Sequence, residues 1–326
     1  MSLHPAVAAV RRGVRAVLAD LPAGSTVVVA CSGGADSLAL LSAAVFEGHK
    51  RAQRVVGVTV DHGLQEGSAG HAERVVAQMA GLGADETMAV RVRVEAPGLG
   101  PEAAAREARY AALGQAAESL GSRVVLLGHT RDDQAETVLM GLTRGSGGRS
   151  LAGMRRAFEV YRRPLLDVGR AETEAACRAE GITWWEDPHN DDPRFLRSRV
   201  RRTVLPLLEQ ELGPGVATTL ARTAEQLRAD MELLDALADQ ALATVLDPAD
   251  QGALVVDRLA ELAPALRSRV LRLAALAAGA PPAELFHEHV VALDRLVTHW
   301  HGQRWIDLPG PLRAVRRDGR IVVERP

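Results

Sequence analysis

Lysine is almost absent from this chain of 326 residues, because Lys50 is the only lysine among 39 basic residues. The common phosphate-binding loop carries a lysine directly after its glycines, so the chain contains no loop of that type. Acidic residues number 41, and the formal net charge is −2. The protein is therefore not a polycation, and any contact with nucleic acid must come from a local patch of arginines.

Cysteine and long apolar runs are scarce as well. The only two cysteines, Cys31 and Cys177, lie far apart and form no Cys-x-x-Cys pair, which argues against a zinc site and a redox motif. Such low cysteine usage is typical of the reduced cytoplasm. No apolar run reaches the length that a membrane span requires. We therefore expect a cytoplasmic protein with no membrane partner.

The composition otherwise predicts a globular protein of two domains. Apolar residues make up 47% and charged residues 25% of the chain, as in folded soluble proteins, and the length suits two domains. The segment Gly213-Pro214-Gly215 marks a change of character along the chain. We therefore predict one domain at residues 1–212 and a second at 213–326.

The glycine-rich segment Ser32-Gly33-Gly34-Ala35-Asp36-Ser37 carries the strongest signal for function. It follows an apolar run at 26–31 that predicts a buried strand, and it precedes an apolar run at 38–41 that predicts a helix. Glycines let successive backbone N–H groups turn toward one anion, and a helix N-terminus adds partial positive charge. Asp36 is placed to act as a metal ligand beside such an anion, and the Ser37 hydroxyl is placed to contact a phosphate.

The first domain is predicted to be an α/β domain. Helical segments separate apolar strands at 26–31, 54–60, 88–94, 123–127 and near Val160. This alternation is typical of a doubly wound, mostly parallel, Rossmann-like sheet, whose ligands bind at the carboxyl ends of the strands. We therefore expect segment 32–37, Asp61-His62 and the segment from Gly128 to converge on one crevice.

A cluster of polar side chains follows the strand at 123–127. Its members are His129, Asp132, Asp133, Gln134 and Glu136. In a helix, residues three or four apart lie on the same side, so Glu136 shares a side with both aspartates. Helix capping by Thr130 and Asp133 would account for one or two acids but not for the whole cluster. Capping and function both remain open interpretations at this point.

Arginines gather after a turn that contains Trp184 and Trp185. Five of them fall within nine residues, at Arg194, Arg197, Arg199, Arg201 and Arg202. A charge run usually covers a solvated helix face. Here the neighbouring acids lie upstream rather than between the arginines, so a contact with a phosphate backbone is the alternative. The loop at 144–150 is either a linker or a mobile substrate loop.

A smaller, mainly helical domain is predicted beyond residue 215. Leu220, Leu227 and Leu234 recur every seven residues, which predicts one long amphipathic helix that also offers a surface for a homodimer. Further helices are expected to about Trp300, followed by a terminal hairpin of 304–308 against 320–323. Four histidines lack cysteine or acidic partners at metal-binding spacing, so exposed side chains are favoured at His287, His289, His299 and His301.

The loop at 32–37 resembles the pyrophosphate loop of the N-type ATP pyrophosphatases, the PP-loop superfamily. Further motifs narrow the resemblance to the tRNA(Ile)-lysidine synthase family, over roughly the first 206 residues. They are Asp61–Leu64, Glu102 with Ala105–Tyr110, His129–Thr137, Arg144-Gly145, Gly153-Met154, Arg163–Leu166, Trp185–Pro188 with Asn190, and Arg197–Pro206. Ser198 departs from the asparagine that is usual in the family.

The resemblance implies a PP-loop ATPase fold and a defined reaction. ATP and L-lysine modify the wobble cytidine of an isoleucine tRNA with a CAU anticodon, which gives lysidine, AMP and pyrophosphate. Codon specificity changes from AUG to AUA. In this family the cytosine 2-oxygen attacks the α-phosphate and expels pyrophosphate, and the lysine ε-amine then displaces AMP. Mg²⁺ is the implied metal, placed near Asp36.

The resemblance also implies roles for individual residues. ATP binding is implied for Ser32, Gly33, Gly34, Ala35, Asp36, Ser37, Asp61, His62 and His129. Catalysis is implied for Asp36, Asp132, Asp133 and Glu136, the last three binding the lysine ammonium or deprotonating it. Phosphate or tRNA contacts are implied for Arg106, Arg109, Arg197, Arg199 and Arg201. A splayed-out cytidine would stack on Trp184 or Trp185, for which burial is the alternative.

Two other classes of protein remain to be weighed. Another PP-loop enzyme, either a tRNA thiolase or an amidating synthetase, is one alternative. Thiolation of this type generally needs a cysteine pair, and amidation needs a glutaminase domain or partner; neither is visible in the sequence. A non-catalytic adenine-nucleotide binder is the other, and it would need neither the acidic cluster nor the arginine run.

Overall fold

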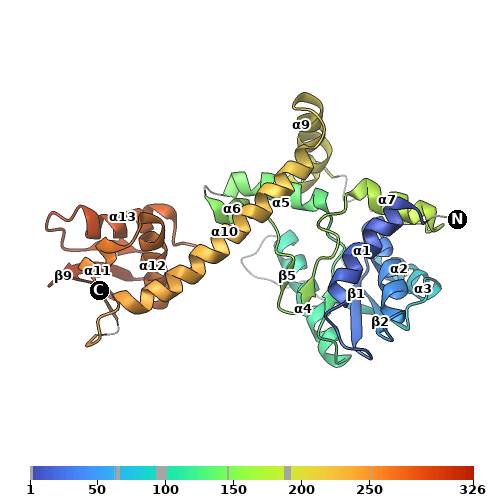
Figure 1. Ribbon diagram of the computed structural model, residues 1–326, viewed down its shortest axis with the longest axis horizontal. Coiled ribbons are helices and arrows are strands. Elements are labelled where there is room, and N and C mark those ends of the chain that lie inside the picture. The colour runs from blue at the N-terminus through green and yellow to red at the C-terminus, as the bar shows by residue number, and fades with distance from the viewer. Residues whose placement is uncertain are drawn as a thin grey trace. The chain divides into compact units, whose positions relative to one another are not determined.

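The computed structural model describes residues 3–61, 63, 67–92, 101–144, 147–186, 192–250 and 252–326, without the side chains of residues 101, 102 and 144. The chain divides into two compact units, Met1–Gln226 and Leu227–Pro326 (Figure 1). Their boundary falls within helix α10, Val216–Val245. The domain limits predicted from the sequence, 1–212 and 213–326, stay a prediction.

The first unit is built on a six-stranded sheet in the order β3-β2-β1-β4-β6-β5. Every neighbouring pair is parallel except β5 and β6. The strands are β1 Thr26–Ala30, β2 Arg54–Asp61, β3 Glu86–Arg91, β4 Val125–Leu126, β5 Ala157–Phe158 and β6 Tyr161–Arg162. The predicted mostly parallel, doubly wound sheet is confirmed.

Helices cover both faces of this sheet (Figure 1). Val27 and Val29 of β1 are buried with helices on one face, whereas Val28 is buried with α4 on the other. This division follows from the alternation of side chains along a strand. The first face carries α1 Pro5–Leu18, α2 Ala35–His49, α3 Ser68–Gly81 and α7 Arg170–Ala179, and the second carries α4 Pro101–Ser119.

The remaining helices of this unit follow β4 and α7. After β4 come α5 Arg131–Arg144 and α6 Gly148–Leu151. A longer helical segment begins with α8 Leu196–Arg199, passes through the π-helical turn η2 Val200–Val204 and ends with α9 Leu205–Glu211. In the described part of the chain, no helix is both long and apolar enough to cross a membrane.

The second unit combines helices with an antiparallel sheet in the order β7-β10-β9-β8. Its elements after α10 are β7 Ala253–Val255, α11 Val256–Glu261, α12 Pro264–Ala277, α13 His287–Thr298, β8 Ile306–Leu308, β9 Leu312–Arg317 and β10 Arg320–Glu324. The predicted pairing of 304–308 with 320–323 is wrong, because β9 lies between β8 and β10 and pairs with both. The short strand β7 was not predicted either.

Tight packing of α1 against the segment after β6 generates a test of this fold. A methyl group on Gly13 would lie 2.4 Å from the carbonyl oxygen of Pro164, and that backbone atom cannot move aside easily. Gly13→Ala should therefore lower the free energy of unfolding by about 1–3 kcal/mol, measured by urea denaturation. Gly81→Ala is the matched control, since no atom lies within 4 Å of the added methyl group. Equal stability of the two variants would contradict the packing.

Candidate active site

The glycine loop connects the end of β1 to the start of α2. Gly34 is the N-cap of α2, and no side chain caps this helix in the described structure. Gly33 has a φ of +84°, which favours glycine. The Ser37 hydroxyl donates to the Gly34 carbonyl at 2.9 Å and accepts from the backbone N–H of Ser32 at 3.2 Å. The loop therefore presents an uncapped helix N-terminus, which suits an anion.

The carboxyl ends of β1, β2 and β4 lie at one edge of the sheet, because these three strands are parallel neighbours. From β1 the chain adds β2 and β3 on one side and then β4 on the other side. α/β sheets bind ligands at such a switch point in strand order. A methyl group on Gly128, after β4, would lie 3.2 Å from the backbone carbonyl of Asp36. The two loops are therefore in close contact. Of the predicted pair Asp61-His62, the histidine lies outside the described residues.

Asp36 is joined to the first turn of α7. Its carboxylate accepts a hydrogen bond from the Thr173 hydroxyl and lies 3.6 Å from Nε of Arg170. Burial raises the pKa of Asp36 to about 6, although the guanidinium of Arg170 acts in the opposite direction. Asp36 is therefore ionised at neutral pH but sits in an environment that favours its protonation.

Two acids of the predicted cluster, Asp133 and Glu136, are buried on α5. The side chain of Glu136 is 0% exposed and that of Asp133 is 10% exposed. Asp133 also accepts hydrogen bonds from the backbone N–H and the hydroxyl of Thr130, so the predicted cap is present. Burial acts to raise the pKa of Asp133, but Arg170 and Arg197 hold it below its usual range.

Three guanidinium groups converge on these two acids. Oδ1 of Asp133 accepts from Arg170 at 3.2 Å, from Arg197 at 3.0 Å and from Arg201 at 3.1 Å. Glu136 accepts from Nε of Arg197 at 2.8 Å and from Nε of Arg201 at 2.7 Å. Capping and charge pairing thus coexist in one residue, Asp133. We call Asp133, Glu136, Arg170, Arg197 and Arg201 the acid–arginine cluster.

Asp132 lies beside this cluster rather than within it. Its carboxylate accepts the backbone N–H of Arg170 at 2.7 Å, at the first residue of α7. The same helix turn therefore contacts Asp132 through its backbone and Asp36 through the side chains of Arg170 and Thr173. The loop at 32–37 and the acids of α5 consequently share one wall.

The other predicted arginines are not in the acid–arginine cluster. The side chain of Arg199 is exposed and donates hydrogen bonds to the carbonyls of Pro193 and Arg194, a few residues earlier in the chain. Arg106 lies on α4 and donates to the Tyr110 hydroxyl at 3.2 Å. Arg109 lies on the same helix. Contacts of these side chains with phosphate or tRNA stay a prediction.

His129 is held by an arginine that directly follows strand β6. Its Nδ1 accepts from Nε of Arg163 at 3.2 Å, and Arg163 also donates to the Tyr110 hydroxyl at 3.1 Å. Burial lowers the pKa of His129 to about 3, so the ring is neutral at physiological pH. His129 is therefore a hydrogen-bonding group of this site and not a cation.

Three residues of the site were missed by sequence reasoning: Arg170, Thr173 and Arg163. Arg170 did carry a signal. A cation in the first turn of a helix is unfavourable with respect to the helix dipole, so its presence there predicts a nearby anion. Thr173 carried none, since its partner Asp36 is 137 residues away in the chain. Arg163 stood within a family motif, but its position said nothing about His129.

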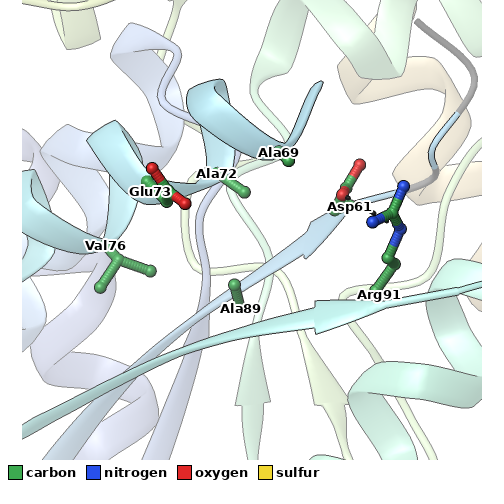
Figure 2. Close-up of a pocket in the computed structure, with 7 residues that line it drawn as sticks. All are labelled: Asp61, Ala69, Ala72, Glu73, Val76, Ala89 and Arg91. Atoms are coloured by element: carbon green, nitrogen blue, oxygen red, sulfur yellow. Dashed lines mark ion pairs between the residues drawn. The ribbon is translucent and has the colours of Figure 1, made fainter. Parts of the chain in front are cut away.

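A pocket of about 330 Å³ opens beside the end of β2. Figure 2 shows Asp61 and Arg91 facing each other at its rim, with their closest nitrogen and oxygen atoms 3.7 Å apart. Its other walls come from α3 and β3, at Ala69, Ala72, Glu73, Val76 and Ala89. The pocket places Asp61 at an opening on the ligand-binding edge of the sheet.

Metal-binding clusters made wholly of protein side chains are not seen in the described ranges, where no group of three His, Cys, Asp or Glu residues could hold an ion. Of the C-terminal histidines, His289 is partly buried and accepts the backbone N–H of Phe286, while the other three are exposed. Several family motifs have residues outside the described part, at Leu64, Gly145, Asp187, Pro188 and Asn190.

Comparisons with known proteins show the family of this chain. Residues 8–208 match the PP-loop domain family, and residues 254–322 match the TilS substrate binding domain. The chain is 55% identical to the tRNA(Ile)-lysidine synthase of Thermobifida fusca, over 98% of both chains. It is 49% identical to the enzyme of that name from Streptomyces coelicolor, over the whole of both chains. This chain belongs to the tRNA(Ile)-lysidine synthase family.

Membership of this family has two direct consequences. The chain is a ligase of the PP-loop type, and its first domain implies the use of ATP. A solved structure, the U34-tRNA thiolase NcsA of Methanococcus maripaludis, matches with a TM-score of 0.57 and 20% identity, over 68% of this chain and 79% of that one. At that identity the likeness shows the shared fold alone.

The acid–arginine cluster generates the first test of the site. Glu136→Gln would remove one buried anion from between Arg197 and Arg201, so we expect a loss of about 3–5 kcal/mol in the free energy of unfolding. Glu174→Gln is the control, because Glu174 pairs with Arg178 on the exposed side of α7 and should cost under about 1 kcal/mol. Similar urea midpoints for the two variants would show that the cluster is not a stabilising network.

The raised pKa of Asp36 generates the second test. Asp36 ionises less readily in the folded state than in the unfolded state. Its ionisation therefore lowers the free energy of unfolding of the protein as the pH rises from about 4 to about 6, by up to about 1.4 kcal/mol per pH unit. Asp36→Asn does not ionise, so its stability relative to wild type should increase over this interval and level off above it. Urea denaturation without nucleotide or metal measures the difference. A difference that does not change with pH would contradict the shift.

Proposed function

We propose that this protein ligates L-lysine to C2 of the wobble cytidine in isoleucine tRNA with a CAU anticodon, using ATP and releasing AMP and pyrophosphate. The observation that carries the proposal is that the first turn of α7 contacts both the glycine loop and the acids of α5, in a chain of this family. The glycine loop offers backbone N–H groups to an anion, which suits the phosphates of a nucleotide. The acids of α5 offer carboxylates, which suit an amine.

The triphosphate of ATP is assigned to the loop at 32–37. Support comes from the uncapped N-terminus of α2 and from the glycines, which leave the backbone accessible. His129 is neutral and partly buried beside this edge, Asp61 is the last residue of β2, and His62 is the next residue in the chain. We assign these three residues to the same nucleotide. When ATP is bound, the loop holds the β- and γ-phosphates as the leaving group.

Asp36 is the residue that fits Mg²⁺. This ion usually binds through one or two carboxylates and completes its coordination with substrate phosphates and water. A single carboxylate at the start of α2 meets that requirement, and its pKa of about 6 leaves it ionised at neutral pH. Bound there, Mg²⁺ supplies charge neutralisation to the departing pyrophosphate.

The lysine ε-ammonium is assigned to the acids of α5. Three guanidinium groups, of Arg170, Arg197 and Arg201, pair with the buried acids Asp133 and Glu136. In the described structure Asp132 accepts the backbone N–H of Arg170 rather than a guanidinium hydrogen bond, so its charge is the one that matches an ammonium group. The amine must lose a proton before it attacks, and a carboxylate of this group is the acceptor at hand.

The tRNA is assigned to arginines outside the cluster and to the second unit. Arg199 and Arg106 are exposed, and with Arg109 they are the predicted contacts for phosphate. Arg197 and Arg201 pair with acids of the cluster, so their effect on the reacting groups is indirect. A tRNA substrate places the enzyme in the cytoplasm. The homodimer expected from the long helix stays a prediction.

Thiolation is the disfavoured alternative. Cys31 and Cys177 are both buried, and burial raises the pKa of each thiol to about 12. Both thiols are therefore protonated at neutral pH, and a protonated thiol is neither a nucleophile nor a good ligand for a metal cluster. Among the described residues of the site, none supports sulfur transfer.

Incorporation of labelled lysine tests the proposed function. Purified protein with ATP and Mg²⁺ should label isoleucine tRNA with a CAU anticodon and leave elongator methionine tRNA unlabelled. Asp36→Ala should still fold but lose turnover, because the loop loses its only carboxylate. ATP cleavage to AMP and pyrophosphate without labelling would move the proposal to another acceptor. Near-normal turnover of Asp36→Ala would refute the role of the loop.

A further inference from the structure

Two consecutive carbonyl groups of the glycine loop are held from outside the loop. The Ser32 carbonyl oxygen lies 3.1 Å from Nε2 of His71, in the first half of α3. The Gly33 carbonyl oxygen accepts a 3.0 Å hydrogen bond from the backbone N–H of Trp185. Neither contact belongs to the acid–arginine cluster, and His71 carried no signal in the sequence.

His71 and Trp185 also contact each other. Their ring centroids lie 4.0 Å apart, with an interplanar angle of 42°. A carbonyl oxygen only accepts, so Nε2 of His71 carries the hydrogen in this contact. Nδ1 of the same ring is buried and has no hydrogen-bond partner in the described structure. The bond to Ser32 is therefore the polar contact that the ring makes here.

The backbone of the loop converts these contacts into an orientation. In a trans peptide the C=O and the N–H point in opposite directions, and the described residues contain no cis peptide bond. The carbonyls of Ser32 and Gly33 face His71 and Trp185. The N–H groups of Gly33 and Gly34 must then face the opposite way. A methyl group on Gly33 would lie 2.8 Å from Val75, so α3 lies directly against the loop.

We propose that His71 and Trp185 form a clamp that aims the amides of the glycine loop at the phosphates of ATP. Both are positioning residues, since they contact the loop and not the nucleotide. His71 supplies a side-chain hydrogen bond, and Trp185 supplies a backbone hydrogen bond and a ring that supports the imidazole. The clamp rests on the proposed function and adds two residues to its ATP site.

Binding of ATP with Mg²⁺, measured by isothermal titration calorimetry without tRNA, is the first arm of the test. His71→Ala should weaken binding about tenfold, the effect of losing one net hydrogen bond of about 1.4 kcal/mol. His71→Gln keeps an N–H donor and should recover most of the loss. His49→Ala is the control, because that ring contacts Asp85 at the other end of α2 and should leave binding unchanged.

The ring contact is tested at Trp185, which keeps the experiment usable if His71→Ala does not fold. Trp185→Phe retains an aromatic ring against His71 and should bind ATP within about threefold of wild type. Trp185→Ala retains the backbone N–H but loses the ring, and should bind about as weakly as His71→Ala. Equal binding by the alanine and phenylalanine variants would overturn the ring's part in the clamp.

Steady-state kinetics separate positioning from general damage. In His71→Ala the KM for ATP should rise about tenfold, while kcat and the KM for lysine stay within about threefold. Changes in all three would indicate a structural role and overturn the clamp. ATP binding by His71→Ala equal to that of wild type would overturn the clamp alone. Failure of the wild-type protein to bind ATP would overturn the proposed function itself.

Discussion

The pairing of Asp133 and Glu136 with three partly buried arginines is the constraint on which the rest of the site depends. Removing an ionised carboxylate from water costs several kcal/mol unless partners of opposite charge surround it. The partners come from α7 and from the segment of α8 and η2, both distant from α5 in the chain. These elements can therefore take only those relative positions that keep every charge paired.

The first turn of α7 joins this network to the nucleotide loop. Arg170 and Thr173 contact Asp36, while the following turn packs Ala176 and Cys177 into the apolar core beside α2. The Cys177 thiol lies 3.4 Å from the carbonyl of Ala35, within the loop itself. Apolar packing thus fixes the position of a polar turn. The glycine loop and the acids of α5 are therefore connected through a helix turn that is held by packing.

Local pattern was sufficient to predict the parallel sheet of the first unit and the edge of that sheet where the candidate site lies. Apolar runs located β1 and β2, and the glycines located the loop, because each signal is contained in a short window of residues. The arginine at position 170 and the threonine at 173 act through partners that are 37 and 137 residues away. Such pairings depend on the fold, so a single sequence does not contain them. Strand β9 was missed for another reason: only Leu312 and Ala314 are buried in it and it ends in two arginines, so its apolar pattern is short.

Residues 200–204 form a π-helical turn between two α-helical segments. A π turn takes about one residue more than an α turn, so its presence sets the angular phase of everything that follows it. Loss of one codon in this stretch would rotate α9 by roughly 100° relative to Arg197, since each residue of an α-helix advances by that angle. Replacement of an outward-facing residue such as Arg199 leaves the phase intact. The orientation of α9 therefore depends on the length of this segment more than on its composition.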